Sequence, residues 1–311
     1  MSMPLDAKAG ELEAPNPRRS KGLTAFSAYL MMSIATLSWS GNIVATKIVM
    51  VDFPPQILIP LRMVGATVLF LLFSAFSLRR RFERARGDWK TFAGLAITGV
   101  VLNQVFFMTG LWYSSVTHAA LTFSMVPIFV LVISRWTHME ALTGAKILGV
   151  LIAFGGVTVL TLSRTPLDAS FRVGNLILLA GAVVFSIYTI LAKRAAVRYD
   201  ALTLNVVSYP MGSLLLAPVM AATLPGFDWG AVSTSGWLAA AYVLIFGATI
   251  PYLLFYKALD YLTAARVAAF GYLQPLLAAG FGFWLLQEQI TRGWALAAVL
   301  ILGGVYLVER E

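Results

Sequence analysis

Aromatic and polar side chains at helical spacing in the first apolar stretch are the residues of this chain that could do chemistry. Trp39, Asn42 and Thr46 are separated by three and four positions, so they share one face of a helix. A ring followed by polar groups on one face can stack on a planar or apolar solute and hydrogen-bond its polar end. Hydrogen bonding to a neighbouring helix is the alternative role for Asn42.

Arg62 is the one charged residue well inside an apolar stretch, about 10 Å from its start at the usual helical rise. Its guanidinium could hold a carboxylate through two parallel hydrogen bonds. It could instead extend along the helix to the nearest polar interface, as long basic side chains do near helix ends. The sequence is compatible with both arrangements.

Further polar side chains lie within the apolar stretches, Asn103 and Gln104 near the middle of one and Tyr252 toward the inner end of another, where an unpaired amide or hydroxyl is costly. They must therefore face either other protein groups or a cavity, and the sequence does not choose between the two. These further candidates for a solute pathway are Asn103, Gln104, Ser186, Tyr188, Tyr252 and Gln274.

The residues that enzymes need are scarce. The sequence has no cysteine and only two histidines, and all fourteen acidic residues fall in tails, loops or the ends of apolar stretches. This supplies neither a metal-ligand set nor an acid and base pair, and no phosphate-binding glycine loop is present. The sequence therefore argues against an embedded enzyme and an ATP-driven pump. It predicts either gradient-driven efflux or coupling through an unobvious group.

The composition identifies the solvent that surrounds these residues. Of 311 residues, 59% are hydrophobic and 12% charged, which is too little polar surface for a water-soluble globule. Residues 1–23 form a polar, basic stretch that we expect to be a disordered cytoplasmic tail. Ten apolar stretches follow, each long enough to cross about 30 Å of hydrocarbon. They are 24–46, 55–77, 91–110, 117–134, 144–162, 174–193, 203–223, 236–256, 265–285 and 293–308.

The basic residues orient these spans. With both termini cytoplasmic, eighteen of the 23 Lys and Arg residues fall on the inner side and four on the outer side, with Arg62 inside a span. This is the positive-inside bias of a multi-pass membrane protein. It also explains the net charge of +9 without a nucleic-acid partner.

The sequence repeats itself after 148 positions. The shift aligns Pro127 with Pro275, Glu140 with Glu288, and the Gly155-Gly156 pair with Gly303-Gly304. Because each copy holds five spans, the second must cross the membrane in the opposite sense to the first. The sequence thus predicts an all-α membrane protein of ten transmembrane helices in two inverted five-helix repeats, 24–162 and 174–308. Many secondary transporters are built this way, with the substrate held between the halves.

The repeated prolines and acids have separate expected roles. Pro127 and Pro275 each remove a helical N–H deep in the bilayer, so we expect both spans to bend there and to line or gate the pathway. Glu140 and Glu288 precede Thr143 and Thr291 just before a span, which suits helix capping at the edge of a gate. The glycine pairs, and a stripe of Ala145, Gly149 and Ala153, permit close helix packing within the bundle or against a second protomer.

These motifs resemble the drug/metabolite transporter superfamily, and specifically its ten-helix group with two EamA-type domains. The resemblance rests on the Trp39-Ser40-Gly41-Asn42 run before Lys47, on the series from Pro127 through Glu140 to Gly155-Gly156, and on its repetition in the second half. It covers nearly the whole chain after residue 23. It implies no cofactor and no catalysis.

The most similar subgroup is the aromatic amino-acid exporters. The resemblance therefore implies export of amino acids and related small metabolites by alternating access, from a bacterial-type inner membrane. A sugar-phosphate or nucleotide-sugar exchanger is the alternative within the fold, although such cargo should need several cations facing the cavity. A multidrug or lipid exporter is also compatible with the sequence. The expected partners are small solutes and the bilayer, and both a monomer and a homodimer remain open.

Overall fold

The computed structural model describes residues 25–114, 116–137, 139, 143–162, 172–277, 281 and 292–310. Throughout these ranges the regular structure is helical and contains no strand, which confirms the predicted all-α class for the described part of the chain. Glu140 and Glu288 lie outside the described residues.

The first half contains eight α-helices, counted over the described residues, and one π-helix. Short 3₁₀ turns, η1 (Ala75–Ser77) and η2 (Arg86–Asp88), flank α4. In chain order, the first half runs α2 (Ala25–Val49), α3 (Pro55–Phe73), α4 (Leu78–Ala85), α5 (Trp89–Leu95), the π-helix η3 (Ala96–Leu102), α6 (Asn103–Trp112), α7 (Val116–Phe123), α8 (Val126–Trp136) and α9 (Gly144–Leu162).

The second half follows the same plan. It includes a second π-helix and two 3₁₀ turns, η5 (Trp229–Ala231) and η7 (Phe270–Tyr272). Its helices are α10 (Arg172–Ala196), α11 (Ala201–Leu215), α12 (Ala217–Thr223), α13 (Thr234–Tyr242), the π-helix η6 (Val243–Thr249), α14 (Ile250–Leu259), α15 (Ala264–Ala269) and α17 (Arg292–Arg310).

Several of these helices can cross a membrane. Among the described residues, four continuous helical segments are long and apolar enough: Pro55–Phe73, Ala75–Trp112, Val173–Ala196 and Thr234–Leu259. A fifth arises if α11 and α12, which meet at a bend of 49°, count as one span. The predicted stretch 203–223 is this bent pair.

The expected bends at the two prolines take different forms. The predicted span 117–134 is not one bent helix, because α7 ends at Phe123 and α8 begins at Val126. Pro127 thus lies in the first turn of a new helix, where its missing N–H leaves no bond unmade. In the second half the 3₁₀ turn η7 comes just before the helical residues around Pro275.

Two π-helical stretches interrupt otherwise long helices at matching places. The bounds of η3 and η6 differ by 147 positions, and each contains a glycine, Gly99 and Gly247, which differ by 148. Pro251 follows η6 and cannot donate to the carbonyl of Gly247, so the ordinary helical ladder is interrupted there. Hydrophobic periodicity did not predict either stretch. Such stretches are frequent at functional sites.

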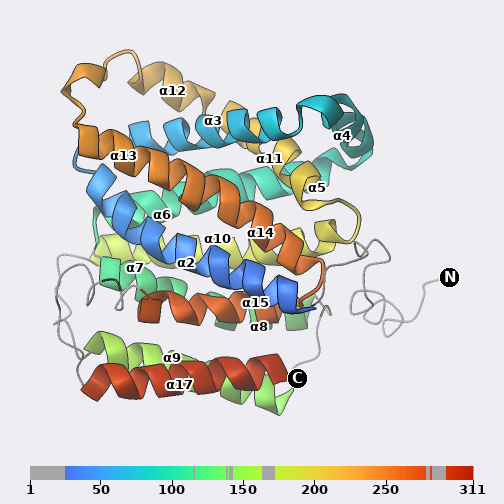
Figure 1. Cartoon of the computed structure of the whole chain (residues 1–311), viewed down its shortest axis with the longest axis vertical. Helices are drawn as coiled ribbons and strands as arrows, with labels where there is room; N and C mark the ends of the chain where they lie inside the picture. Colours follow the sequence, from blue (N-terminus) through green and yellow to red (C-terminus); the bar gives the residue numbers. More distant parts are fainter. Residues whose placement is uncertain are drawn as a thin grey trace.

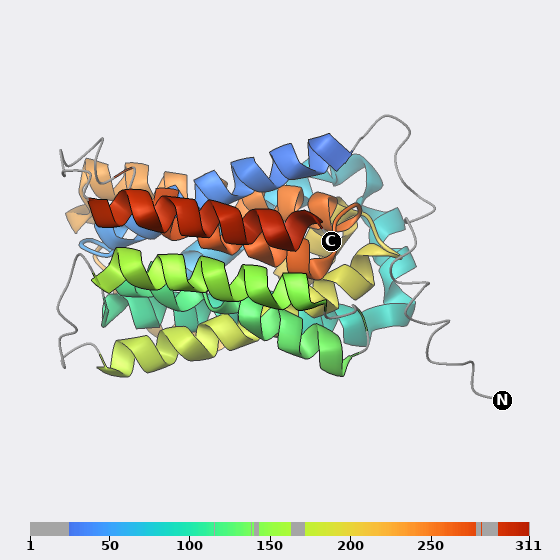
Figure 2. The same ribbon diagram turned by 90° about the horizontal axis from the view of Figure 1, so that it is seen from below.

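The helices lie side by side along one general direction (Figures 1 and 2). Figure 1 shows α2 and α10 running in opposite directions, and α9 and α17 do the same. The start of α2 and the end of α17 lie at the same end of the bundle.

Helices α9 and α17 form a close pair at one edge of the bundle (Figure 1). A Cβ at Gly304 would lie 2.5 Å from the backbone nitrogen of Ala153, and one at Gly149 would lie 2.7 Å from the carbonyl oxygen of Gly304. For Gly149 and Ala153, this confirms the predicted packing of the small-residue stripe within the bundle. Only the second glycine of each predicted pair is used this way, because a Cβ at Gly155 or Gly303 would meet no described atom of another helix within 4 Å.

Candidate functional site

A small cavity lies at the centre of the bundle, between α2, α3, α6, α7, α10 and α14. Its volume is about 50 Å³. Seven of the ten predicted pathway residues line it: Trp39, Asn42, Arg62, Asn103, Gln104, Tyr252 and Gln274. Four lining residues are absent from the predicted set: Ile43, Phe107, Phe123 and Phe185. These four are apolar, so their types alone could not separate them from the other packed residues of the spans.

Arg62 is the charged residue among the described lining residues of this cavity. Its side chain on α3 is 3% exposed, so the alternative in which it extends to the polar interface does not fit the structure. Its Nε and Nη1 atoms form no hydrogen bond with any described residue, and no described carboxylate pairs with it. A buried charge without a partner is destabilising by several kcal/mol, on the order seen for broken buried ion pairs.

Gly247 lets two polar side chains approach the π-helix η6. A Cβ at this position would overlap the Asn42 carboxamide oxygen and lie 2.9 Å from Nη2 of Arg62. Thr46 donates to the same Asn42 oxygen at 3.4 Å, one helical turn away on α2. Thr46 therefore supports Asn42 from behind and does not itself line the cavity.

Two amides from α6 meet the hydroxyl of Tyr252 on α14. Gln104 donates to the hydroxyl oxygen from Nε2 at 2.8 Å, and Asn103 donates from Nδ2 at 3.3 Å. The carbonyl oxygens of both amides are buried and have no hydrogen-bond partner among the described residues. They can therefore accept hydrogen bonds from N–H groups of a solute in the cavity.

Aromatic rings form one wall of the cavity. The Trp39 ring lies edge-on to Phe185 and Tyr252, with centroid distances of 6.0 and 5.5 Å. Phe123 lies 5.3 Å from Phe107 and 6.4 Å from Phe185, also between ring centroids. Contacts of this kind favour planar or apolar groups in the space they border.

Several other predicted residues lie near the cavity without lining it. Ser186 donates to the carbonyl oxygen of Ala182 at 2.8 Å, and Tyr188 is buried between aromatic rings. Neither Pro127 nor Pro275 is among the described lining residues, although the cavity includes the neighbouring Gln274. Their gating role stays a prediction.

Helix capping is observed at one of the two repeated motifs. Thr143 accepts a hydrogen bond from the backbone N–H of Lys146 at 3.2 Å, as expected of a residue that caps α9. Thr291, its counterpart, lies outside the described residues.

Two lysines hold equivalent helix ends and do not face the cavity. Lys47 Nζ donates to the carbonyl oxygens of Leu111 and Ser114, both at 2.9 Å. Lys193, the equivalent residue of α10, donates to those of Leu259 and Leu262 at 2.6 and 2.8 Å. Each ammonium group thus satisfies carbonyls at the end of a long helix, where a positive charge is also favourable.

Equivalent residues of the two halves also touch each other in three pairs, two of which line the cavity. Trp39 and Phe185 correspond by a shift of 146 and are ring neighbours. Thr67 and Ser213 correspond by the same shift, and their hydroxyls lie 2.8 Å apart. Gln104 and Tyr252, related by a shift of 148, share the hydrogen bond described above. The halves therefore meet through their own matching positions around the cavity.

Comparison with known proteins identifies the family. The sequence pattern of the EamA-like transporter family matches twice, over residues 26–162 and 172–310. An uncharacterized transporter of Archaeoglobus fulgidus is 26% identical over 288 residues, covering 91% of this chain and 97% of that protein. The uncharacterized transporter YoaV of Bacillus subtilis is 26% identical over 285 residues, covering 88% and 93%.

A solved structure supports the fold. A crystal structure aligns with a TM-score of 0.74 and 21% identity, covering 90% of this chain and 96% of the other. With two family matches that together span most of the sequence, the chain belongs to the EamA-like transporter family.

Proposed function

We propose that this transporter exports amino acids, aromatic ones included, through the central cavity by alternating access. The chain would cross a bacterial-type inner membrane ten times, as two inverted five-helix repeats over 24–162 and 174–308, with both termini in the cytoplasm. The two family matches, the opposite directions of equivalent helices in Figure 1 and the positive-inside bias support this topology.

The observation that carries the proposal is the unpartnered guanidinium of Arg62. A buried cation that faces a cavity and lacks a described counter-charge is suited to an anionic group of the solute. Arginine binds a carboxylate through two parallel hydrogen bonds, and either of the buried, unpartnered donors Nε and Nη1 could take part in this geometry together with Nη2.

The remaining lining residues complement the rest of an amino acid. The carbonyl oxygens of Asn103 and Gln104 can accept from an ammonium group. The rings of Trp39, Phe185 and Tyr252 favour an aromatic side chain. A solute with a carboxylate, an ammonium group and a ring would thus find a partner for each.

The size of the cavity implies movement. Its volume of about 50 Å³ is far below the roughly 300–1,000 Å³ of typical ligand pockets. Binding an amino acid therefore requires the helices around the cavity to separate. Breaks at α7–α8 and α11–α12, and the π-helices η3 and η6, are the places where the helical ladder is already interrupted.

The small number of basic side chains that line the cavity disfavours a phosphorylated cargo. Arg62 is the only Lys or Arg among the described lining residues, because Lys47 and Lys193 bind carbonyls at helix ends. A sugar phosphate or nucleotide sugar carries more negative charge and should need several cations.

Uptake of labelled amino acids into liposomes that hold the purified protein tests the proposal. Unlabelled amino acid trapped inside should accelerate uptake of labelled phenylalanine or of a neutral amino acid. Trp39→Ala and Asn42→Ala should weaken the exchange, whereas Arg80→Gln, an exposed arginine outside the cavity, should leave it within about twofold. Folded protein that exchanges no amino acid would remove the cargo assignment and redirect the search to drugs, phosphorylated metabolites or lipids.

A further inference from the structure

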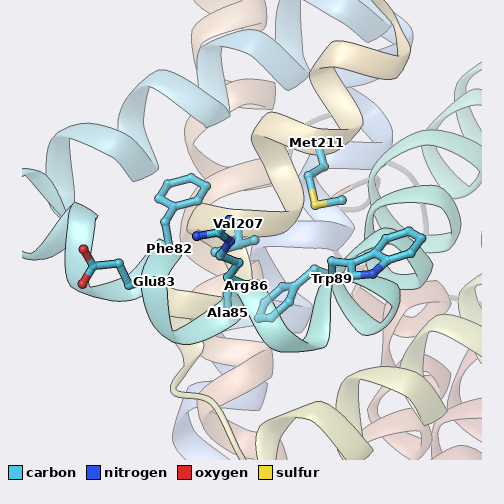
Figure 3. Close-up of a pocket in the computed structure, with 8 residues that line it drawn as sticks. Phe82, Glu83, Ala85, Arg86, Trp89, Val207 and Met211 are labelled. Atoms are coloured by element: carbon cyan, nitrogen blue, oxygen red, sulfur yellow. The ribbon is translucent and has the colours of Figure 1, made fainter.

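A second, larger hollow lies at the end of the bundle where α4 leads into α5 (Figure 3). Its volume is about 410 Å³, and it shares no described lining residue with the central cavity. The argument uses six of its lining residues: Phe82, Arg86, Trp89, Phe92, Val207 and Met211. We call this hollow the α4–α11 groove.

The floor of the groove is apolar and runs into the bundle. Val207 and Met211 are one turn apart on α11, so they share a face (Figure 3). They lie seven and eleven residues after Asp200, the residue that caps the start of α11. At the usual rise, these positions are roughly 10 and 16 Å along the helix from its polar end. The groove therefore descends from a polar surface into the apolar layer.

The mouth of the groove carries an unengaged positive charge. Arg86 is exposed, and no described residue pairs with it. Two neighbouring arginines are engaged: Arg79 donates to Glu83 at 2.8 Å, and Arg81 donates to Asp200 at 2.6 Å. Glu83 is the one acidic residue among the described lining residues, and Arg79 already neutralises it.

Aromatic side chains border the same mouth. Trp89 is 60% exposed and Phe82 is 39% exposed, on either side of Arg86 in Figure 3. Exposed tryptophan beside basic residues is typical of the level of a bilayer at which lipid headgroups lie.

We propose that the α4–α11 groove binds one anionic phospholipid. Arg86 receives the phosphate, Trp89 lies at the level of the headgroup, and an acyl chain follows Phe92, Val207 and Met211 into the bilayer. The positive mouth selects an anionic over a zwitterionic headgroup, as basic pockets at the membrane surface do. The apolar floor selects a lipid over a soluble phosphate, which could not use it.

Native mass spectrometry of the full chain in detergent tests this site. The probe is an equimolar mixture of phosphatidylglycerol and phosphatidylcholine with identical acyl chains. Wild-type protein should retain one phosphatidylglycerol in preference to phosphatidylcholine. Arg86→Gln should lower the affinity for phosphatidylglycerol about fivefold, and Arg86→Lys should keep most of it.

Two further variants separate a built site from general charge attraction. Arg80→Gln removes an exposed arginine of α4 that does not line the groove, and should change lipid binding less than twofold. Val207→Phe narrows the floor and should weaken binding although Arg86 is intact. The thermal unfolding midpoint of each variant should stay near that of wild type.

Three results would overturn the proposal. Equal retention of the two lipids would remove the selective role of Arg86. Equal losses in Arg80→Gln and Arg86→Gln would show diffuse attraction to a basic surface. Displacement of phosphatidylglycerol by excess inorganic phosphate would show that the groove binds an anion and not a lipid.

Discussion

The two halves of the bundle place different residues around the same backbone feature. In one half, η6 carries Gly247, against which Asn42 and Arg62 lie. In the other half, η3 carries Gly99, and a Cβ there would lie 2.8 Å from Cζ of the Tyr188 ring. The two halves align with a shift of 146 positions over α2 and α3, which makes Asn42 equivalent to Tyr188. From η3 onward the shift is 148 positions, and by this shift Gly99 is equivalent to Gly247. Asn42 and Arg62, which we call the polar set, line the central cavity. Tyr188, which with its neighbouring rings we call the packed set, does not line it, and neither does Gly99.

The chemistry of the two sets is opposite. The equivalent of Arg62 is Ser208, whose hydroxyl donates to the carbonyl oxygen of Leu204 at 2.6 Å. Tyr188 stacks on Phe255 at 5.8 Å and lies edge-on to Tyr256 at 6.0 Å between ring centroids. One half therefore holds unsatisfied polar groups beside a cavity, while the other fills the matching space with packed rings. A duplicated backbone can thus carry a single polar site.

The largest expected effect follows from removing the charge of the polar set. Arg62→Gln should lower phenylalanine exchange about 100-fold, because the carboxylate loses its partner. The same change should raise the thermal unfolding midpoint, because an unpartnered buried charge is destabilising. Exchange in liposomes and thermal unfolding in detergent measure the two effects. A variant that loses both exchange and stability would indicate a structural role for Arg62.

The two equivalent glycines should respond differently to the same substitution. Gly247→Ala would push Asn42 and Arg62 apart and should lower exchange about tenfold, with a small change in stability, because those side chains are flexible. Gly99→Ala would collide with the packed Tyr188 ring and should cost about 1–3 kcal/mol of stability, as overpacking does. Exchange assays and denaturant unfolding of both variants separate these outcomes, and equal behaviour of the two would contradict the comparison.

Two acidic residues in the matching connections, Asp52 between α2 and α3 and Asp200 between α10 and α11, extend the comparison. Asp52 accepts from Ser233 at 2.6 Å, whereas Asp200 accepts from Arg81 at 2.6 Å and from the backbone N–H of Thr203 at 3.1 Å. Burial raises the pKa of Asp200, but the hydrogen bonds from Thr203 and Arg81 outweigh it, so the pKa is lowered overall.

A pH series tests the stabilising role of Asp200. Because its folded pKa lies below the usual value near 3.9, its contribution is present above that value and disappears as the pH falls through the folded pKa. Asp200→Asn should cost about 1 kcal/mol near neutral pH, since it removes a half-exposed ion pair and a negative charge at the helix N-terminus. The difference between wild type and variant in thermal unfolding should shrink toward pH 3. A difference that is constant over this range would exclude the carboxylate as its source.

The smallest effect is expected in the packed set. Tyr188→Phe keeps the ring and its stacking on Phe255, so exchange should change less than twofold and stability by about 1 kcal/mol. Exchange and unfolding measurements on this variant complete the comparison. A tenfold loss of exchange would mean that the Tyr188 hydroxyl takes part in transport.

Sequence periodicity predicted the helices well where they are regular. The stretch 144–162 matches α9 residue for residue, and Arg62, Asn103 and Gln104 were recognised because a polar side chain in an apolar span stands out. Phe107 and Phe123 also line the cavity, but they are apolar like the residues around them in the sequence, so residue type does not distinguish them.

Which of the predicted residues line the cavity depends on tertiary contacts that the sequence does not reveal. Thr46 and Tyr188 share helical faces with candidate residues, yet Thr46 bonds to Asn42 and Tyr188 fills the space over Gly99. The π-helices η3 and η6 were not predicted because they change the hydrogen-bond pattern without changing the apolar composition. Side-chain direction and backbone register at these places depend on the neighbouring helix, which is distant in sequence.

The most direct test of the central claim compares two solutes that differ in one group. Labelled phenylalanine and labelled phenethylamine, which lacks the carboxylate, should be offered to liposomes that hold the wild-type protein and trapped unlabelled phenylalanine. If Arg62 binds the carboxylate of the cargo, phenylalanine exchanges and phenethylamine does not. Equal protein-dependent exchange of both solutes would contradict the account.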